Sequence, residues 1–325
     1  MSATAVPTTS TPPAVGVGGP TMAGRVRQRL STRGATAAAI IIAIVWTIPT
    51  FGLFISSFRP EDDIKSSGWW TIFTDPAFTL QNYNEVLFGG GGSRLSSARL
   101  SEYFLNSIVI TIPSVLFPLL LGALAAYALS WMNWKGRDWV FIAIFALQIV
   151  PLQMALVPLL RLFSQGLTVG GVTIVPDLNL VGPEKFATVW FAHTCFALPL
   201  CVFLLHNFMS DLPRELIEAA RVDGADHARI FRSITLPLIV PALAAFAIFQ
   251  FLWVWNDLLV ALIFAGGTQD VAPLTVKLAD LAGTRGNEWQ RLTAGAFVSM
   301  VVPLIVFISL QRYFVRGLLV GGLKG

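Results

Sequence analysis

Six long apolar runs, separated by shorter polar segments, dominate the pattern of hydrophobic and polar positions along this chain. Each run holds about 19 to 27 residues, enough for an α-helix rising about 1.5 Å per residue to cross about 30 Å of hydrocarbon with some tilt. The pattern therefore predicts an all-α protein that spans a membrane with six helices. We place these helices at residues 35–58, 104–130, 138–160, 186–206, 238–264 and 293–311.

Composition supports an integral membrane protein. The chain is 55% hydrophobic and 12% charged, whereas a soluble domain carries about a quarter charged residues. A net charge of +4 and a pI near 9.3 are typical of a membrane chain with basic cytoplasmic loops, so we expect a lipid bilayer and no nucleic acid as partner. Cys195 and Cys201 share one apolar run, which favours small buried side chains over a disulfide framework.

Polar segments divide the chain further. The opening "MSATAVPTTSTPPAVGVGGP" has no apolar periodicity, so a disordered, basic tail is expected over 1–34. It is not typical of a secretory signal, because the first apolar run begins late and is long enough to span. After the first helix follow an extracytoplasmic segment, a core domain and a short tail, at 59–103, 104–314 and 315–325. The glycines of "FGGGGSR", Gly89 to Gly92, predict an external flap.

Basic residues set the orientation. A cytoplasmic N-terminus places 13 of the 22 lysines and arginines in cytoplasmic segments, as the positive-inside rule favours. Both termini are therefore predicted to be cytoplasmic, and 207–236 becomes the one long cytoplasmic loop.

That loop carries signals for two short helices. In "DLPRELIEAARVDG", Asp211 and Pro213 predict a helix start and Gly224 its stop. Asp226 can cap a second helix, "HARIFRSITLP", in which apolar residues recur at helical spacing. From periodicity alone the loop could insert into a groove of another protein or lie on lipid as an amphipathic hairpin.

The residues of this loop resemble a known motif. Glu218-Ala219-Ala220, then Gly224 and Leu236-Pro237 at their spacings, resemble the EAA loop of binding-protein-dependent ABC importer permeases. The resemblance runs from about Ile48 to the C-terminus. The stretches "SSFRPEDDI", "FTLQNYNEVL", "NSIVIT", "AAYALSWMNWKGRD" and "QRYFVRGLLVGGLKG" are similar to the MalG-type subunit of carbohydrate importers, and the final third looks most like α-glucoside importer permeases.

The resemblance implies a type I ABC importer permease fold in the cell membrane, moving a mono- or oligosaccharide by alternating access. It also implies three partners: a second, MalF-type permease, an ATPase homodimer that binds ATP and Mg, and an extracytoplasmic sugar-binding protein. In the family, the small alanines seat the loop in a cleft of the ATPase, the glutamate meets a basic residue there, and the glycine allows a sharp turn. The implied coupling residues are Glu218, Ala219, Ala220, Asp223, Gly224, Ile234, Leu236 and Pro237.

No G-x-x-x-x-G-K-[ST] phosphate loop, H-E-x-x-H motif or G-x-S-x-G elbow occurs in the sequence. We therefore expect that the chain is not an enzyme, binds no cofactor and leaves ATP hydrolysis to a partner.

The fifth apolar run contains a candidate substrate path. Gln250, Trp253 and Asp257 recur at i, i+3 and i+7, which predicts one helix face, and Asn256 lies beside them. A carboxylate inside a span is a functional candidate, and an aromatic plane beside hydrogen-bonding groups suits a sugar. The same face could instead pack against the second permease. In the family's maltose importers the other permease supplies most sugar contacts, which favours packing.

Other residues are interpreted structurally. His193 and His206 bracket the fourth run without an acidic cluster, so no metal site is expected. Pro151, Pro158 and Pro199 predict helix kinks.

Two alternative functions remain open at the level of sequence. An ABC permease for another solute, such as a polyol, glycerol phosphate or an amino acid, would share the loop. An ion-driven secondary transporter would show inverted repeats and would not need Glu218.

Overall fold

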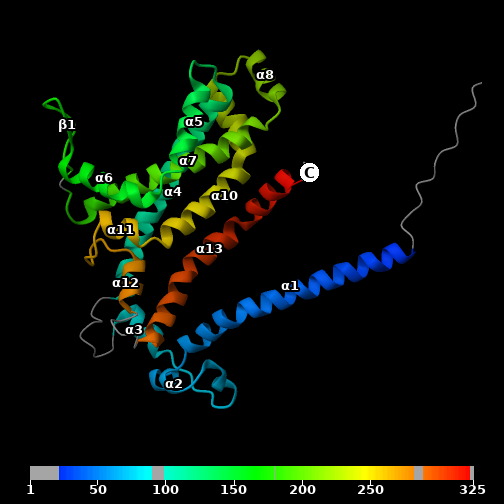
Figure 1. Cartoon of the computed structure of the whole chain (residues 1–325), viewed down its shortest axis with the longest axis vertical. Helices are drawn as coiled ribbons and strands as arrows, with labels where there is room; N and C mark the ends of the chain where they lie inside the picture. Colours follow the sequence, from blue (N-terminus) through cyan, green and yellow to red (C-terminus); the bar gives the residue numbers. More distant parts are fainter. Residues whose placement is uncertain (1–21, 90–98, 179, 282–287, 323–325) are drawn as a thin grey trace, which may run out of the picture. The chain divides into compact units, whose positions relative to one another are not determined.

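The computed structural model describes residues 22–89, 99–178, 180–281 and 288–322, with side chains between residues 33 and 311. Residues up to Leu53 form one compact unit, and the chain from Phe54 onward forms a second. The described part of the first unit is helical and belongs to α1 (Met22–Ser57), drawn in blue in Figure 1. Residues 22–34, expected in the disordered tail, are therefore helical, whereas 1–21 lie outside the described residues.

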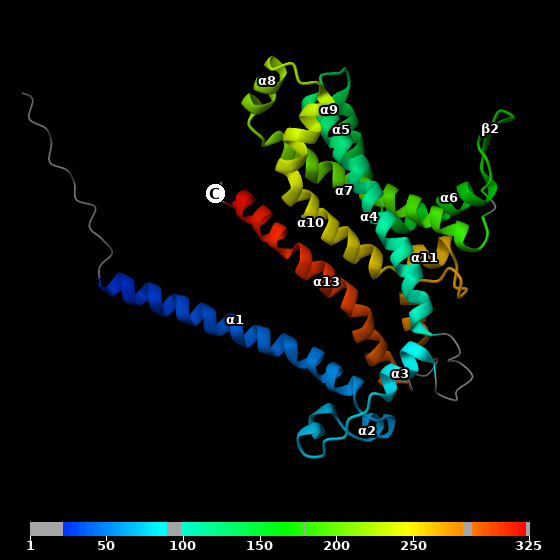
Figure 2. The same ribbon diagram turned by 180° about the vertical axis from the view of Figure 1, so that it is seen from behind.

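Four long helices form the body of the second unit: α4 (Leu100–Trp131), α7 (Phe186–Ser210), α10 (Leu236–Trp255) and α13 (Trp289–Gly322). Helices α4 and α7 pack along each other, α10 packs against both, and α13 packs against α10 (Figures 1 and 2). Within the described residues, five helices are long and apolar enough to cross a membrane, or six if one bent pair counts as a single span. The predicted all-α membrane fold is confirmed.

The tightest contact between α4 and α7 lies at Gly122. A Cβ placed on Gly122 would lie 2.5 Å from Sγ of Cys201, so only glycine lets the two backbones approach this closely. The Cys201 thiol donates to the Pro118 carbonyl oxygen at 3.3 Å, a weak hydrogen bond between the two helices. A small residue on one helix and a thiol on the other thus fix the crossing.

The third predicted span is broken. It consists of α5 (Arg137–Leu147) and α6 (Leu152–Gln165), which meet at 100°. The backbone amides that follow α5 form i→i−3 bonds, such as Val150 N to Leu147 O at 3.2 Å. Pro151 has no N–H with which to continue the helix. Pro151 therefore breaks the span, whereas Pro158 and Pro199 lie inside uninterrupted helices.

The fifth predicted span, 238–264, is also shorter than expected. Helix α10 ends at Trp255, and a separate short helix, α11 (Leu259–Phe264), follows. The side-chain amide of Asn256 donates to the Leu252 carbonyl at 2.8 Å. The Asp257 carboxylate accepts from the backbone amides of Val260 and Ala261 in the first turn of α11. Short polar side chains that bond nearby backbone compete with helix continuation.

Shorter elements complete the second unit. They are α2 (Glu61–Ser66), η1 (Trp69–Phe73), α3 (Gln81–Phe88), β1 (Leu167–Val169), β2 (Val172–Val175), η2 (Gly182–Lys185) and α12 (Leu274–Leu281). β1 and β2 pair antiparallel, a small hairpin that the sequence pattern did not predict. Its two turn residues, Gly170 and Gly171, both have positive φ, as a two-residue hairpin turn requires.

The segment after α1 is ordered around a buried arginine. The Arg59 guanidinium donates to the backbone of Asp63 and Ser67 and to the Thr71 hydroxyl, at 3.0 to 3.3 Å. These bonds satisfy a charge that is almost fully buried. The flap expected at Gly89 to Gly92 lies, after Gly89, outside the described residues.

The Gly122 contact generates a stability prediction. Gly122→Ala should lower the free energy of unfolding in detergent by about 1 to 3 kcal/mol, because the new methyl overlaps the Cys201 side chain. Thermal unfolding followed by intrinsic fluorescence measures the effect. Adding Cys201→Ala should recover part of the loss.

Gly34→Ala is the matched control, because nothing lies within 4 Å of a Cβ at that helical position. It should leave stability unchanged or raise it by about 0.5 to 1 kcal/mol. Equal losses in the two variants would contradict the assigned α4 and α7 packing.

Candidate functional site

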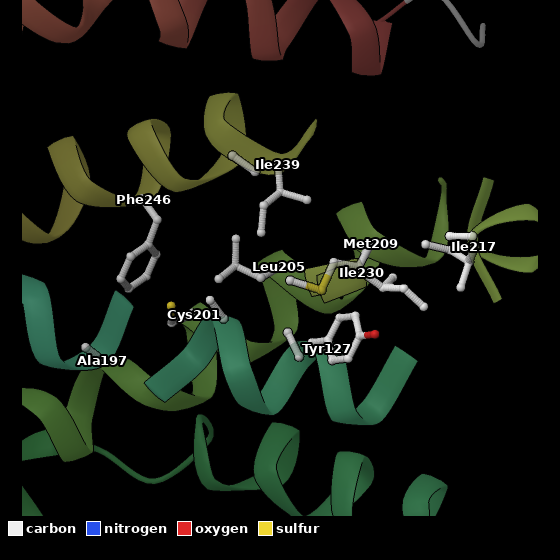
Figure 3. Packing of buried hydrophobic residues seen from close by; sticks show 13 residues of the cluster. Tyr127, Ala197, Cys201, Leu205, Met209, Ile217, Ile230, Ile239 and Phe246 are labelled. Carbon is white, nitrogen blue, oxygen red and sulfur yellow. The ribbon is translucent and has the colours of Figure 1, made fainter. Parts of the chain in front are cut away.

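The predicted coupling loop contains a two-faced helix, α8 (Arg214–Val222). Its inner face places Ile217 and Ala220 in the hydrophobic cluster formed by α4, α7 and α10, where Figure 3 shows Ile217 beside Met209 and Ile230. Its outer face exposes Glu218 and Ala219. The exposed outer face also includes Val222, with 88% of its surface accessible, so this helix presents apolar area beside charged side chains of both signs.

Gly224 ends α8 in a tight reversal. Its φ is +79°, a conformation that costs a residue with a Cβ about 1 to 2 kcal/mol. The Ala225 amide donates to the Ala220 carbonyl at 2.9 Å and the Gly224 amide donates to that of Arg221 at 3.0 Å, the two bonds of a Schellman motif. The predicted glycine stop is confirmed, and Asp223 is the C-cap residue before it.

The second helix of the loop is the start of the fifth span. Asp226 caps α9 (His227–Ile230) by accepting from the Arg229 amide at 2.8 Å, as predicted. The chain then continues through a π-helical segment, η3 (Phe231–Thr235), directly into α10. Pro237 lies in the first turn of α10, where its missing N–H is tolerated. A pair of separate short helices is therefore the wrong description, because the second one is continuous with the span.

The candidate residues at this junction face different surroundings. Ile234 packs on the same hydrophobic cluster as Ile217, Leu236 is half-buried and Pro237 is exposed. The start of α8 also differs from the prediction, since Pro213 precedes the helix as its N-cap and Asp211 belongs to the end of α7.

Two polar contacts fix the loop to the end of α4. The Tyr127 hydroxyl and Nδ1 of His227 lie 3.0 Å apart, and Nη2 of Arg221 donates to the Trp131 carbonyl at 3.0 Å. The Tyr127 ring also meets the Phe231 ring edge-on, with centroids 5.3 Å apart. The loop is therefore attached to α4 through both α8 and α9, and α9 continues into α10.

The second group of candidate residues does not form one helix face. Gln250 is 4% exposed and donates to the Ser114 carbonyl on α4 at 3.2 Å, whereas Trp253 is 50% exposed. Asn256 and Asp257 follow the end of α10. The predicted i, i+3, i+7 face is wrong at Asp257, because the helix has ended before it.

A cavity of about 430 Å³ collects Gln250 and Trp253 with residues that sequence reasoning did not single out for this role. Its walls come from the break between α5 and α6, from α7 and from α10. Gln148, Cys195 and Phe249 are among the lining residues, and so is His193. These residues lie far apart in the sequence. The local signals that pointed to this place were the prolines Pro151 and Pro199 and the predicted pair Gln250 and Trp253.

Asp257 has a structural role at the start of α11. Its carboxylate accepts from the amides of Val260 at 3.3 Å and Ala261 at 2.9 Å. Asp257 therefore caps the first turn of α11 from the position before the N-cap residue, Leu258. Oδ2 also lies 3.6 Å from Nε2 of His193, whose side chain is 2% exposed. Asp257 thus holds the second break together and faces α7, and it does not line the cavity.

Metal chemistry finds no support in the described part of the chain. No three His, Cys, Asp or Glu side chains among the described residues approach closely enough to hold a metal ion. His206 packs against the Phe141 ring, with centroids 4.2 Å apart.

Comparison with known proteins places this geometry in a family context. The family model described as binding-protein-dependent transport system inner membrane component matches residues 118–320. The match covers the end of α4 from Pro118 onward, α7, α10, the loop between them, the cavity and most of α13.

Individual relatives cover most of the chain. The osmoprotective compounds uptake permease protein GgtD of Synechocystis sp. is 50% identical over 287 residues, 88% of this chain and 90% of the relative. The alpha-glucoside transport system permease protein AglG of Rhizobium meliloti is 47% identical over 281 residues, 86% of this chain and 70% of the relative. The melibiose/raffinose/stachyose import permease protein MelC of Bacillus subtilis is 32% identical over 302 residues, 93% of this chain and 100% of the relative.

Solved structures share the fold. A chain of a bacterial ABC transporter involved in the import of the acidic polysaccharide alginate superposes with a TM-score of 0.65 at 21% identity, covering 89% of this chain and 98% of that one. A chain of an alginate ABC transporter in complex with a pentasaccharide-bound periplasmic protein gives 0.58 at 17% identity, covering 89% and 96%.

The N-cap geometry of Asp257 generates a prediction. Asp257→Ala should lower the free energy of unfolding by about 1 kcal/mol, because the α11 amides lose their acceptor. Asp257→Asn should lower the free energy of unfolding much less, since asparagine caps a helix about as well as aspartate does. Thermal unfolding of the two variants in detergent compares them, and an equal loss in both would assign the stabilisation to the charge facing His193 instead of the cap.

Proposed function

Because the chain belongs to the family of binding-protein-dependent transport system inner membrane components, we propose that it is one permease subunit of an ATP-driven importer for neutral sugars. The observation that carries the proposal is the exposed face of α8 at the end of a helical bundle of this family. As a permease subunit the chain is a non-catalytic, multi-pass membrane component. ATP and Mg would bind to partner subunits.

The sugar assignment is supported by the relatives. Two of them, AglG and MelC, are described as permeases for alpha-glucosides and for melibiose, raffinose and stachyose, and both align over most of this chain. GgtD is described by osmoprotective compounds, so a small neutral polyol is the second candidate solute.

We assign the outer face of α8 to the ATPase dimer. Glu218 projects from an exposed helix that is held at its base by the Ile217 contact and by the Schellman turn. The small Ala219 beside it allows close approach of another surface, and the exposed Val222 supplies apolar area. A cleft with a basic residue opposite Glu218 would complement this face.

The contacts behind α8 support a mechanical role. Closure of the ATPase dimer would displace α8, and the Tyr127 and Arg221 contacts would carry that displacement to α4. The uninterrupted helix from His227 to Trp255 would carry it to the cavity. Alternating access then follows from two states of the bundle, with a MalF-type permease as the other half and a sugar-binding protein docking on the extracytoplasmic side.

Charge reversal on α8 tests this assignment. Glu218→Lys should reduce sugar uptake to below about a tenth, because opposing like charges at an interface cost several kcal/mol. The measurement is uptake of radiolabelled maltose, with sucrose and sorbitol in parallel, into proteoliposomes that hold the complete transporter and its binding protein. Binding-protein-stimulated ATP hydrolysis should fall with it.

Glu184→Lys is the matched control, since it reverses an exposed glutamate in η2, at the opposite end of α7. Both variants should unfold within about 0.5 kcal/mol of the parent. Normal uptake and normal ATPase stimulation in Glu218→Lys would contradict the coupling role, and an ion-driven transporter would then become the better description.

A further inference from the structure

The cavity beside the α5 and α6 break has a lining that selects for one chemistry. It is enclosed on three sides by the Gln148 to Leu152 segment, α7 and α10, and has a volume of about 430 Å³. Its described lining residues include no Asp, Glu, Lys or Arg. A charged solute such as glycerol phosphate would lose its hydration there without gaining an opposite charge.

Two aromatic rings form a platform on one side of this cavity. Phe249 and Trp253 lie one turn apart on α10, with ring centroids 5.4 Å apart and planes at 70°. Both side chains are about half exposed in the chain by itself, at 46% and 50%. Exposed aromatic faces bury apolar C–H surface well, and the C–H faces of a pyranose ring match them.

Neutral polar groups border the platform. Gln148 is exposed in the turn between α5 and α6 and lines the cavity. Gln250 is oriented by its bond to the Ser114 carbonyl. His193 contributes a buried imidazole to the lining, and its Nε2 lies 3.6 Å from Oδ2 of Asp257. Amide and imidazole groups pair with hydroxyls without requiring a charge on the solute.

We propose that this cavity holds a neutral glycosyl unit during transport, so that this chain supplies sugar contacts of its own through Trp253, Phe249 and Gln148. The proposal rests on the proposed function of sugar import and adds the site to it. Lipid, or a side chain of the second permease, would be the competing occupant of the same space.

The two cysteines of the chain provide a direct test. Cys195 lines the cavity and is partly exposed, whereas Cys201 is fully buried between α4 and α7. In the complete reconstituted transporter, N-ethylmaleimide should label Cys195 and leave Cys201 unlabelled, as read by peptide mass spectrometry of this chain. Maltose or sucrose, whichever the same vesicles import, should slow Cys195 labelling saturably by about fivefold at several times its half-saturating concentration. Glycerol 3-phosphate should give no protection.

The outcomes separate the site from the function. Sugar import without protection of Cys195, or a Cys195 that never reacts, overturns the cavity as a sugar site and leaves the importer intact. Import of glycerol 3-phosphate instead of any neutral sugar overturns both proposals.

A substitution gives an independent readout. Trp253→Ala should lower kcat/KM for sugar uptake about fivefold to tenfold through loss of the aromatic platform, while Trp253→Phe retains most of it. Binding-protein-stimulated ATP hydrolysis should persist in both, which distinguishes this defect from that of Glu218→Lys. The control is Trp139→Ala, an exposed tryptophan of α5 outside the cavity. An equal loss of uptake in the Trp253 and Trp139 variants contradicts the proposal.

Discussion

Hydrocarbon offers no hydrogen-bond partner, so a chain that crosses it must satisfy each backbone amide and carbonyl from within the protein. Most of this chain meets the requirement with uninterrupted helices. Two of the described spans are broken, after Leu147 and after Trp255, and each break carries its own compensation. The first uses tight i→i−3 bonds before Pro151, and the second uses the Asn256 and Asp257 side chains. Non-helical backbone within a membrane is tolerated only where protein or water surrounds it. The first break borders the cavity, and the second lies at the C-terminal end of α10, where Asp257 faces α7.

The same constraint explains what could be predicted from sequence. Long apolar runs have few alternatives to a helix, so the spans were located to within several residues. The breaks were harder to predict. Pro151 identified the first by its missing N–H, but the second depends on which backbone groups the Asp257 carboxylate reaches, and hydrophobic periodicity carries no information on that. The prediction extended the 3.6-residue periodicity through Asp257, but α10 ends at Trp255, so Asp257 does not lie on the same helix face as Gln250 and Trp253.

The loop between α7 and α10 was predicted in more detail than the cavity, for a physical reason. Its determinants are local: Gly224 is needed for a positive φ, and Asp226 caps four residues of helix. The resemblance placed Ala220 with Ala219 against the ATPase, whereas Ala220 is buried against the bundle, because the face of α8 that turns inward depends on tertiary packing. The cavity joins Gln148, His193 and Trp253 from three elements that are distant in the sequence. Only the tertiary packing brings them together, so most of its lining could not be found from spacing.

The uninterrupted helix from His227 to Trp255 fixes a rotational phase between the two functional regions. Each residue of an α-helix advances the direction of its side chain by about 100°. One residue inserted or removed between Asp226 and Phe249 would leave the loop seated on α4 but would turn the aromatic rings by about 100° away from the cavity wall formed by α7. The distance in sequence between the loop and the cavity is therefore fixed along this helix, because every residue between them sets the direction in which Phe249 and Trp253 project.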